Sequence, residues 1–156
     1  MTVVVRPFRV EDAAACGAIV GATPLWADGG LDAARATAML TTAAAAGDTL
    51  LVLDVDGTLT GFAWIDRGGA FGRSAYLRQI AIAPAARSAG LGARLLLAFE
   101  TVAIMESPYA FLLVSETNHA ARRFYERHGY AEVGRIPDYP KPSNLELLYR
   151  KVLQPA

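Results

Sequence analysis

Residues 77–99 constrain this chain more than any other stretch, because they join an apolar strand, a glycine-bearing turn and an amphipathic helix. The strand runs into Pro84, the motif Arg87-x-x-Gly90-x-Gly92 follows, and a helix begins on the glycines. A helix start leaves main-chain N–H groups without partners and carries the positive end of the helix dipole. Glycine adds no Cβ that would hold a ligand away from the backbone. The pattern predicts a cradle for a phosphate-like anion, and the same residues also fit an ordinary strand-to-helix turn.

Length and charge limit the classes of function. A chain of 156 residues is long enough for one domain, residues 1–156, with a sizeable core. Fifteen basic and fifteen acidic residues cancel, which argues against a dedicated nucleic-acid-binding protein. Residues 1–72 hold four basic and eight acidic side chains, whereas residues 73–156 hold eleven basic and seven acidic ones. The half that contains the glycine motif therefore has positive charge to offer a polyanion.

The cellular compartment is suggested by one cysteine and by the absence of long apolar stretches. Cys16 has no partner for an internal disulfide, which fits a reducing compartment, and its alanine-rich surroundings favour a small core residue. Residues 1–7 resemble no secretory signal, and no apolar segment approaches the roughly 20 residues that span a bilayer. We expect a cytoplasmic protein without a membrane partner.

Hydrophobic periodicity predicts an α/β (α+β) chain. The predicted strands are 3–6, 49–55, 59–65, 75–82, 109–115, 130–135 and 144–152; the predicted helices are 11–20, 31–46, 91–106 and 118–128; and 21–30 is a loop. Asp56-Gly57 predicts a hairpin turn. The strand–helix–strand crossover makes two strands parallel in a mixed, mostly antiparallel sheet. Their carboxyl ends and the glycine motif are expected to converge on one cleft.

A second informative stretch covers residues 118–130. Asn118 can cap a helix, and its amide can also bind a peptide-like ligand. Tyr125 lies two turns further along the same helical face, where core packing is the alternative role. Gly129 suits the left-handed position after a helix end.

The Arg-x-x-Gly-x-Gly motif at 87–92, followed by Asn…Ala…Phe-Tyr-Glu…Gly-Tyr at 118–130, resembles the two core motifs of the GNAT acetyltransferases. The element order resembles that family over nearly the whole chain, and the motif residues cover about 77–130. The resemblance implies a GNAT-like fold whose parallel crossover forms the cofactor cleft. It also implies an acyltransferase that moves an acetyl group from acetyl-CoA directly to a primary amine, without a metal.

The same resemblance implies a role for each motif. Strand backbone would bind the pantetheine arm, the glycine turn would bind the pyrophosphate, and Tyr125 would protonate the departing thiolate. The implied cofactor-binding residues are Ile80, Ala81, Ile82, Arg87, Ser88, Ala89, Gly90, Leu91, Gly92, Ala93, Asn118 and Tyr125.

The general base and the acceptor stay open. Leu113 occupies the position where some relatives carry a glutamate, so Glu116 and a water chain are the alternatives, with Gln79 as a residue that orients a water. Trp26 and Tyr139 lie in loops that flank the acceptor site in proteins of this resemblance, and we expect an aromatic wall there. The acceptor is a small molecule or a peptide, no nucleic acid is expected, and a homodimer is plausible by resemblance.

Two other functions deserve comparison. Residues 54–58, Asp-Val-Asp-Gly-Thr, resemble the nucleophile motif of haloacid dehalogenase-like phosphatases, with Asp54 and Asp56 as the acidic pair. That chemistry needs a downstream acidic cluster for Mg²⁺, which the sequence lacks, whereas a hairpin explains all five residues. A non-catalytic coenzyme A sensor, which binds without turnover, is the other alternative and draws support from Leu113.

Overall fold

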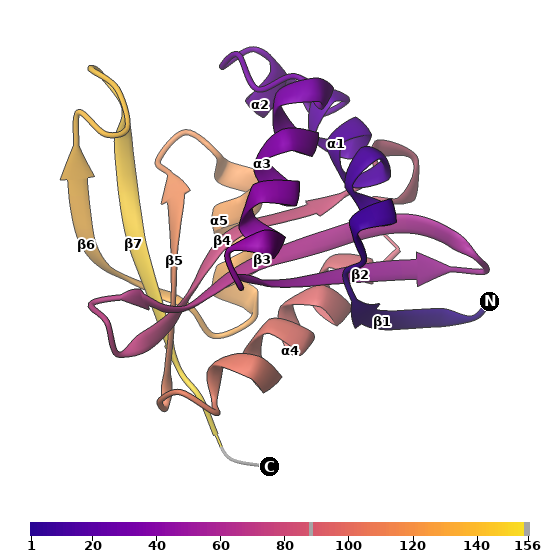
Figure 1. The fold of residues 1–156 in the computed structure, drawn as a ribbon. Coiled ribbons are helices and arrows are strands. Elements are labelled where there is room, and N and C mark those ends of the chain that lie inside the picture. Colours follow the sequence, from indigo (N-terminus) through magenta and orange to yellow (C-terminus); the bar gives the residue numbers. More distant parts are fainter. Residues whose placement is uncertain (88, 155–156) are drawn as a thin grey trace. The chain divides into compact units, whose positions relative to one another are not determined.

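The computed structural model describes residues 1–87 and 89–154 of the chain. The strands are β1 (Val3–Pro7), β2 (Thr49–Val55), β3 (Thr58–Ala70), β4 (Ser74–Ile82), β5 (Tyr109–Ser115), β6 (Ala131–Pro137) and β7 (Leu145–Val152). The α-helices are α1 (Ala13–Gly21), α2 (Pro24–Ala27), α3 (Ala33–Ala45), α4 (Leu91–Ala103) and α5 (His119–Arg127), and the 3-10 turns are η1 (Val10–Asp12) and η2 (Pro84–Ala86). Figure 1 shows their course.

The seven strands form a mixed sheet in the order β1-β2-β3-β4-β5-β7-β6. Strands β4 and β5 are parallel, and α4 connects them, which confirms the predicted crossover. The pairs β1–β2, β2–β3, β5–β7 and β6–β7 are antiparallel. The predicted fold class, a mostly antiparallel α/β sheet with one parallel pair, is therefore confirmed.

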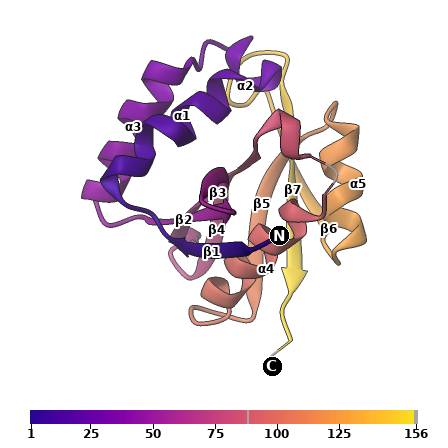
Figure 2. The same ribbon diagram turned by 90° about the vertical axis from the view of Figure 1, so that its right-hand side faces the viewer.

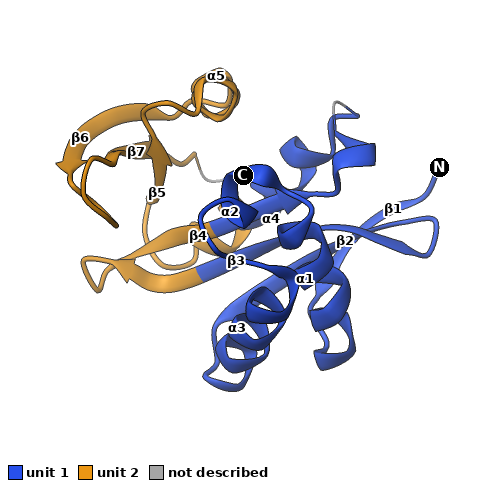
Figure 3. Cartoon of the chain, turned by 90° about the horizontal axis from the view of Figure 1, so that it is seen from above, with its two compact units in different colours: residues 1–65, 79–99 blue, residues 66–78, 100–156 orange. Residues whose placement is uncertain are grey.

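Two compact units make up the chain (Figure 3). Unit 1 comprises residues 1–65 and 79–99, and unit 2 comprises residues 66–78 and 100–156. Strands β3 and β4 and helix α4 each contribute residues to both units. The assignment of the whole chain to one domain stays a prediction.

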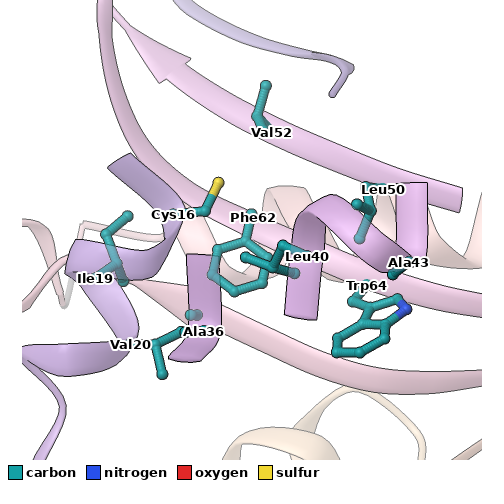
Figure 4. Packing of buried hydrophobic residues seen from close by; sticks show 11 residues of the cluster. Cys16, Ile19, Val20, Ala36, Leu40, Ala43, Leu50, Val52, Phe62 and Trp64 are labelled. Carbon is teal, nitrogen blue, oxygen red and sulfur yellow. The ribbon is translucent and has the colours of Figure 1, made fainter. Parts of the chain in front are cut away.

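The core of unit 1 lies between a helical pair and the sheet. Helices α1 and α3 lie side by side over β2 and β3, while α4 begins on the opposite face (Figures 1 and 2). Cys16, Leu40 and Phe62 meet in the cluster shown in Figure 4, and each is at most 1% exposed. Burial raises the pKa of the Cys16 thiol to about 12, so this cysteine is a protonated core residue rather than a nucleophile.

Gly17 allows α1 to approach α3 closely. A Cβ at this position would lie 2.6 Å from the carbonyl oxygen of Ala33 and would also collide with the hydroxyl of Thr37. A clash with backbone cannot be relieved by turning a side chain, so the two helices would have to separate.

The contacts of Asp12 explain why the first helix begins later than the sequence predicts. The first helix starts at Ala13, two residues later than predicted, after the 3-10 turn η1. Asp12 accepts hydrogen bonds from Arg6 Nη1 at 2.8 Å and from the Arg9 N–H at 2.7 Å, and the Arg6 bond is the main cause that lowers its pKa. The carboxylate therefore binds the chain that precedes α1 and makes no capping hydrogen bond to that helix.

Three further boundaries correct the sequence prediction. Residues 21–30 are not all loop, because Pro24 occupies the first turn of the short helix α2. Strand β3 runs to Ala70 instead of ending at residue 65, and its hairpin turns at Phe71 and Gly72, where φ is +61° and +69°. Helix α4 ends at Ala103, three residues before the predicted end at 106.

In unit 2, β5 and β7 form a ladder that extends from Tyr109↔Val152 to Ser115↔Glu146. Strand β6 pairs with the outer edge of β7. Tyr149 of β7 is 1% exposed, and its hydroxyl hydrogen-bonds Arg122 and Glu126 of helix α5, so the helix is bound to this sheet. No described helix in either unit has both the length and the apolarity needed to cross a membrane.

We expect Gly17→Ala to destabilise the protein by about 1–3 kcal/mol, because overpacking costs that much in a tight interior. Helix propensity alone predicts the opposite sign, a gain of roughly 0.5–1 kcal/mol. Denaturant midpoints measure the difference. Ala18→Gly, at the exposed neighbouring position, measures the propensity effect without the contact; a more stable Gly17→Ala protein would contradict the close approach of α1 and α3.

Candidate active site

The parallel ladder between β4 and β5 is short. It comprises three residue pairs and ends at Leu77↔Leu112. Strand β4 nevertheless continues to Ile82, and β5 continues to Ser115. The main-chain groups of residues 80–82 therefore lie past the last pair of that ladder. A strand edge of this kind can pair with an extended, amide-bearing ligand.

Gly61 in β3 lets the end of β4 lie close to it. A Cβ on Gly61 would lie 2.7 Å from the carbonyl oxygen of Ala81 and 2.7 Å from Cδ1 of Ile82. It would also lie 3.2 Å from Cδ1 of Leu95 in α4. Gly61 therefore helps to position the end of β4 in the candidate site. The sequence analysis does not single it out, although a glycine inside a strand signals a close backbone approach.

The segment after β4 is held by the side chain of Arg87. Its Nε donates to the carbonyl oxygen of Ile82 at 3.3 Å, and its Nη2 donates to Oγ1 of Thr23 at 3.1 Å. Thr23 is 7% exposed and in turn donates to the carbonyl oxygen of Ile19. Arg87 thus fixes the entrance of the cradle, which we define as residues 87–93. The predicted site residue Ser88 lies outside the described residues.

The rest of the cradle presents bare backbone. Gly90 has φ +74°, a left-handed conformation, and a Cβ built there would meet nothing within 4 Å. Helix α4 begins at the next residue, Leu91, so the N–H groups of Leu91, Gly92 and Ala93 have no partner within the helix. Leu91 is 5% exposed and anchors this turn in unit 1, and Ala89 is exposed. These open N–H groups and the helix dipole suit an anion.

Asn118 caps α5, as predicted. Its Oδ1 accepts a hydrogen bond from the Ala121 N–H at 3.2 Å. The Nδ2 group makes no hydrogen bond to any described residue, so two donors remain available to a ligand carbonyl. One side chain can therefore define the helix start and bind an amide-bearing molecule.

Tyr125 is held by aromatic packing. It is 7% exposed, and its ring makes edge contacts with Phe124 at 5.3 Å and with Tyr130 at 5.8 Å between centroids. Within the described part of the chain, its hydroxyl has no hydrogen-bond partner. Burial, with a smaller contribution from Tyr76, raises the pKa of Tyr125 above its ordinary value near 10. The phenol therefore keeps its proton throughout the physiological range and can act as an acid.

A polar network fixes the helix that carries Tyr125. The Tyr149 hydroxyl donates to Oε2 of Glu126 at 2.6 Å and accepts from Nε of Arg122 at 3.3 Å. Arg122 also donates from Nη1 to the carbonyl oxygen of Glu116 at 3.0 Å. The contacts tie α5 both to β7 and to the turn that precedes it, so the position of Tyr125 depends on this network.

The carboxylates near the end of β5 differ in their surroundings. Glu116, the predicted base, is 44% exposed in its side chain and lies 3.9 Å from Nη1 of Arg135. Glu146 of β7 is half-buried, and its Oε2 accepts a hydrogen bond from Oγ of Ser115 at 2.6 Å. Sequence reasoning missed this pair. Leu113 is half-buried and supplies no titratable group.

The predicted acceptor residues are distributed over both units. Trp26 lies in α2 of unit 1, half-buried against the core cluster, and Gln79 is half-buried at the point where β4 enters that unit. Tyr139 is 48% exposed between β6 and β7 of unit 2. Residues 80–82 and the cradle lie in unit 1, whereas Asn118 and Tyr125 lie in unit 2. The aromatic wall and the common cleft stay predictions.

The acidic pair at the β2–β3 hairpin serves the turn. Oδ1 of Asp54 accepts from the Gly57 N–H at 2.7 Å, and Oδ1 of Asp56 accepts from the Thr2 N–H at 2.7 Å. Asp56 and Gly57 both have positive φ, as a tight hairpin requires. Residues 1–87 and 89–154 contain no group of side chains that could hold a metal ion. The hairpin interpretation of this motif is therefore confirmed.

Comparison with known proteins gives a consistent picture. The model of the GNAT acetyltransferase family matches residues 19–130. A GNAT-family protein from Desulfovibrio desulfuricans has 22% identity and a TM-score of 0.83, with 98% of this chain and 100% of that chain covered. The yncA protein of Salmonella typhimurium, solved with its cofactor acetyl-CoA, has 19% identity, a TM-score of 0.76 and coverages of 100% and 96%.

A third structure, the ribosomal-protein-alanine N-acetyltransferase of Brucella melitensis, has 21% identity, a TM-score of 0.76 and coverages of 96% and 99%. At these identities the structural matches establish the fold alone. Comparison with curated proteins gave no match.

We expect Tyr149→Phe to lower the free energy of unfolding by about 1–2 kcal/mol, because it removes the hydroxyl of a buried residue that hydrogen-bonds both Arg122 and Glu126. Tyr109→Phe is the control, since Tyr109 is 41% exposed. Burial and the Glu126 bond raise the Tyr149 pKa, although Arg122 opposes them. The stabilisation should therefore persist below pH 10 or so and decline as the pH rises through the higher folded pKa. Equal denaturation midpoints at pH 7 would contradict the network.

Proposed function

Because this chain belongs to the GNAT family of acetyltransferases, we propose that it transfers an acetyl group from acetyl-CoA directly to a primary amine of a small molecule or peptide. The observation that carries the proposal is the open backbone at Gly90, which leads directly into the unpartnered N–H groups of α4. A side chain at Gly90 would occupy the space that a diphosphate needs. Acetyl-CoA supplies the activated thioester, and no metal is required.

The chemistry of the residues fits each part of this cosubstrate. The cradle offers main-chain donors and a helix dipole to the diphosphate. The main chain of Ile80, Ala81 and Ile82 offers a strand edge to the amides of the pantetheine arm. The free Nδ2 donors of Asn118 suit a carbonyl of the same arm.

The reaction needs an acid that protonates the departing thiolate and a base that takes protons from the amine. The acceptor must lose a proton before its nitrogen has a lone pair for attack on the thioester carbonyl. As the C–N bond forms and the C–S bond breaks, the sulfur leaves with the bonding electrons, and Tyr125 gives it a proton. The attacking nitrogen loses a second proton, to Glu116 or to a water chain that Gln79 orients, and solvent restores the phenol. No acyl-enzyme is involved, and buried Cys16 is not an acyl carrier.

A non-catalytic sensor is the second candidate, because Leu113 offers no carboxylate beside the end of β5. Two measurements separate the candidates. Thermal unfolding with millimolar coenzyme A tests binding, and thiol release from acetyl-CoA across a panel of primary amines tests transfer. We expect a raised Tm and amine-dependent thiol release. A raised Tm without release from any amine favours the sensor. If coenzyme A does not raise the Tm and no amine causes thiol release, both candidate functions are refuted.

Tyr125→Phe is expected to lower kcat roughly 10²-fold, because it deletes the acid while keeping the ring contacts. The Kd for acetyl-CoA should stay unchanged. Tyr130→Phe is the matched control: it loses a hydroxyl that donates to Glu100 at 2.9 Å, so stability should fall while kcat remains. Steady-state kinetics and calorimetry measure both variants, and an unaltered kcat for Tyr125→Phe would remove this residue from the mechanism.

Gly90→Val is expected to raise the Kd for coenzyme A at least tenfold, because a branched side chain fills the cradle and strains its left-handed backbone. Gly47→Val is the matched control, since Gly47 also has positive φ, +92°, and open space around it. Both variants should lose comparable stability, but only the Gly90 variant should lose affinity in calorimetry. Equal affinities would show that the anion binds elsewhere.

A further inference from the structure

One face of the unit 2 sheet carries the carboxylate of Glu146, which a hydrogen bond from Ser115 orients. Glu146 in β7 lies directly opposite Ser115 in β5, and the Ser115 hydroxyl donates to its Oε2 at 2.6 Å. The other oxygen, Oε1, makes no hydrogen bond or ion pair with the described residues. A half-buried carboxylate with one oxygen fixed and one available is oriented for a further donor.

Strand register shows what shares this face with Glu146. Side chains alternate along a strand, and directly paired residues of neighbouring strands point to the same side. Register and alternation therefore put one set of side chains on the same face as the carboxylate. The set is Tyr76 and Arg78 of β4, Phe111, Leu113 and Ser115 of β5, and Leu148 and Arg150 of β7.

Helix α5 covers the opposite face of the same strands. Arg122 and Glu126 of that helix bind the Tyr149 hydroxyl, and Tyr149 alternates with Glu146 and Leu148 along β7. The buried residues of β5 and β7 lie on that covered side, whereas Glu146 and Leu148 are only half-buried. The face that holds Glu146 is therefore the more accessible one in unit 2.

The charges near Tyr76 include that of Glu146, and Tyr76 in turn affects the candidate acid. Burial raises the pKa of the Tyr76 phenol, the charges of Tyr139 and Glu146 raise it further, and Arg78 opposes them. Tyr76 in turn contributes to the raised pKa of Tyr125. Glu146 and Tyr125 each lie within electrostatic range of the same phenol, although they belong to opposite faces of the sheet.

We propose that Glu146 binds the ammonium group of the acceptor through its free Oε1 and takes the proton that the amine must lose. This inference rests on the proposed acetyl transfer, and it supplies a base for the first of the two protons that the nitrogen loses. Glu116 already has a cation beside it, since Nη1 of Arg135 lies 3.9 Å from its carboxylate. Glu146 is presented on the strand face itself, next to Ser115.

The same face indicates the class of acceptor. Leu113 and Leu148 form a directly paired apolar surface beside the carboxylate, so an apolar body next to the amine would gain by burial there. Arg78 and Arg150 place positive charge on this face, which disfavours a second ammonium group. The acceptor is a primary amine on an aliphatic or aromatic body, rather than a polyamine.

The test uses 2-phenylethylamine as the probe. Glu146→Gln keeps an oxygen that accepts from Ser115 but removes the negative charge. We expect kcat/KM for the probe to fall at least tenfold, while the Kd for acetyl-CoA and the Tm stay unchanged. Glu132→Gln is the matched control: its carboxylate is bound by Arg135 at 3.1 Å, and its loss should leave kcat/KM unaltered.

A binding measurement provides a readout that does not depend on turnover. Calorimetry of the probe against the wild-type protein saturated with coenzyme A should give binding that weakens at least tenfold in Glu146→Gln. Ser115→Ala keeps the charge and should lose less. Wild-type protein that binds coenzyme A but not the probe, equal values for wild type and Glu146→Gln, or spermidine as the better acceptor would each overturn the inference. Wild-type protein without coenzyme A binding or thiol release instead refutes the proposed function.

Discussion

The three-pair parallel ladder between β4 and β5 is the constraint on which the other features depend. A parallel pair needs a crossover connection, and α4 supplies it with its first turn at the carboxyl end of β4. Because the ladder ends at Leu77, the rest of β4 has main-chain groups that its parallel neighbour does not use. The strand edge and the cradle are thus consequences of one topological step.

Much of the fold was predictable because its signals are local. Asp56-Gly57 demands a positive-φ turn, and the apolar period of α4 identifies a helix packed on one side. Errors arose where local signals compete. Pro24 is typical of a loop but also opens the short helix α2, and Gly68 and Gly69 interrupt the strand pattern although β3 continues through them. Asp12 precedes α1, but its side chain binds Arg6 and the Arg9 N–H instead of capping that helix.

The candidate site divides in the same way. Gly90 and Asn118 could be identified from the sequence because each is needed by the backbone at its own position. The Ser115–Glu146 pair could not, since it depends on the register that brings together two residues 31 positions apart in the chain. The Tyr149 network was hidden for the same reason. The residues proposed to bind the cosubstrate are therefore recognisable from local sequence, whereas the proposed acceptor residue becomes apparent only from strand pairing.

The donors at the start of α4 belong to the main chain, and this affects how such a protein can diverge. A peptide N–H is present whatever side chain follows it, so substitutions around the cradle leave its hydrogen-bonding capacity intact as long as the turn keeps its conformation. Selection then acts on one glycine and on a helix start rather than on a set of charged residues. On the proposed reaction, side chains on the face that holds Glu146 can change while the main-chain donors of the cradle are kept.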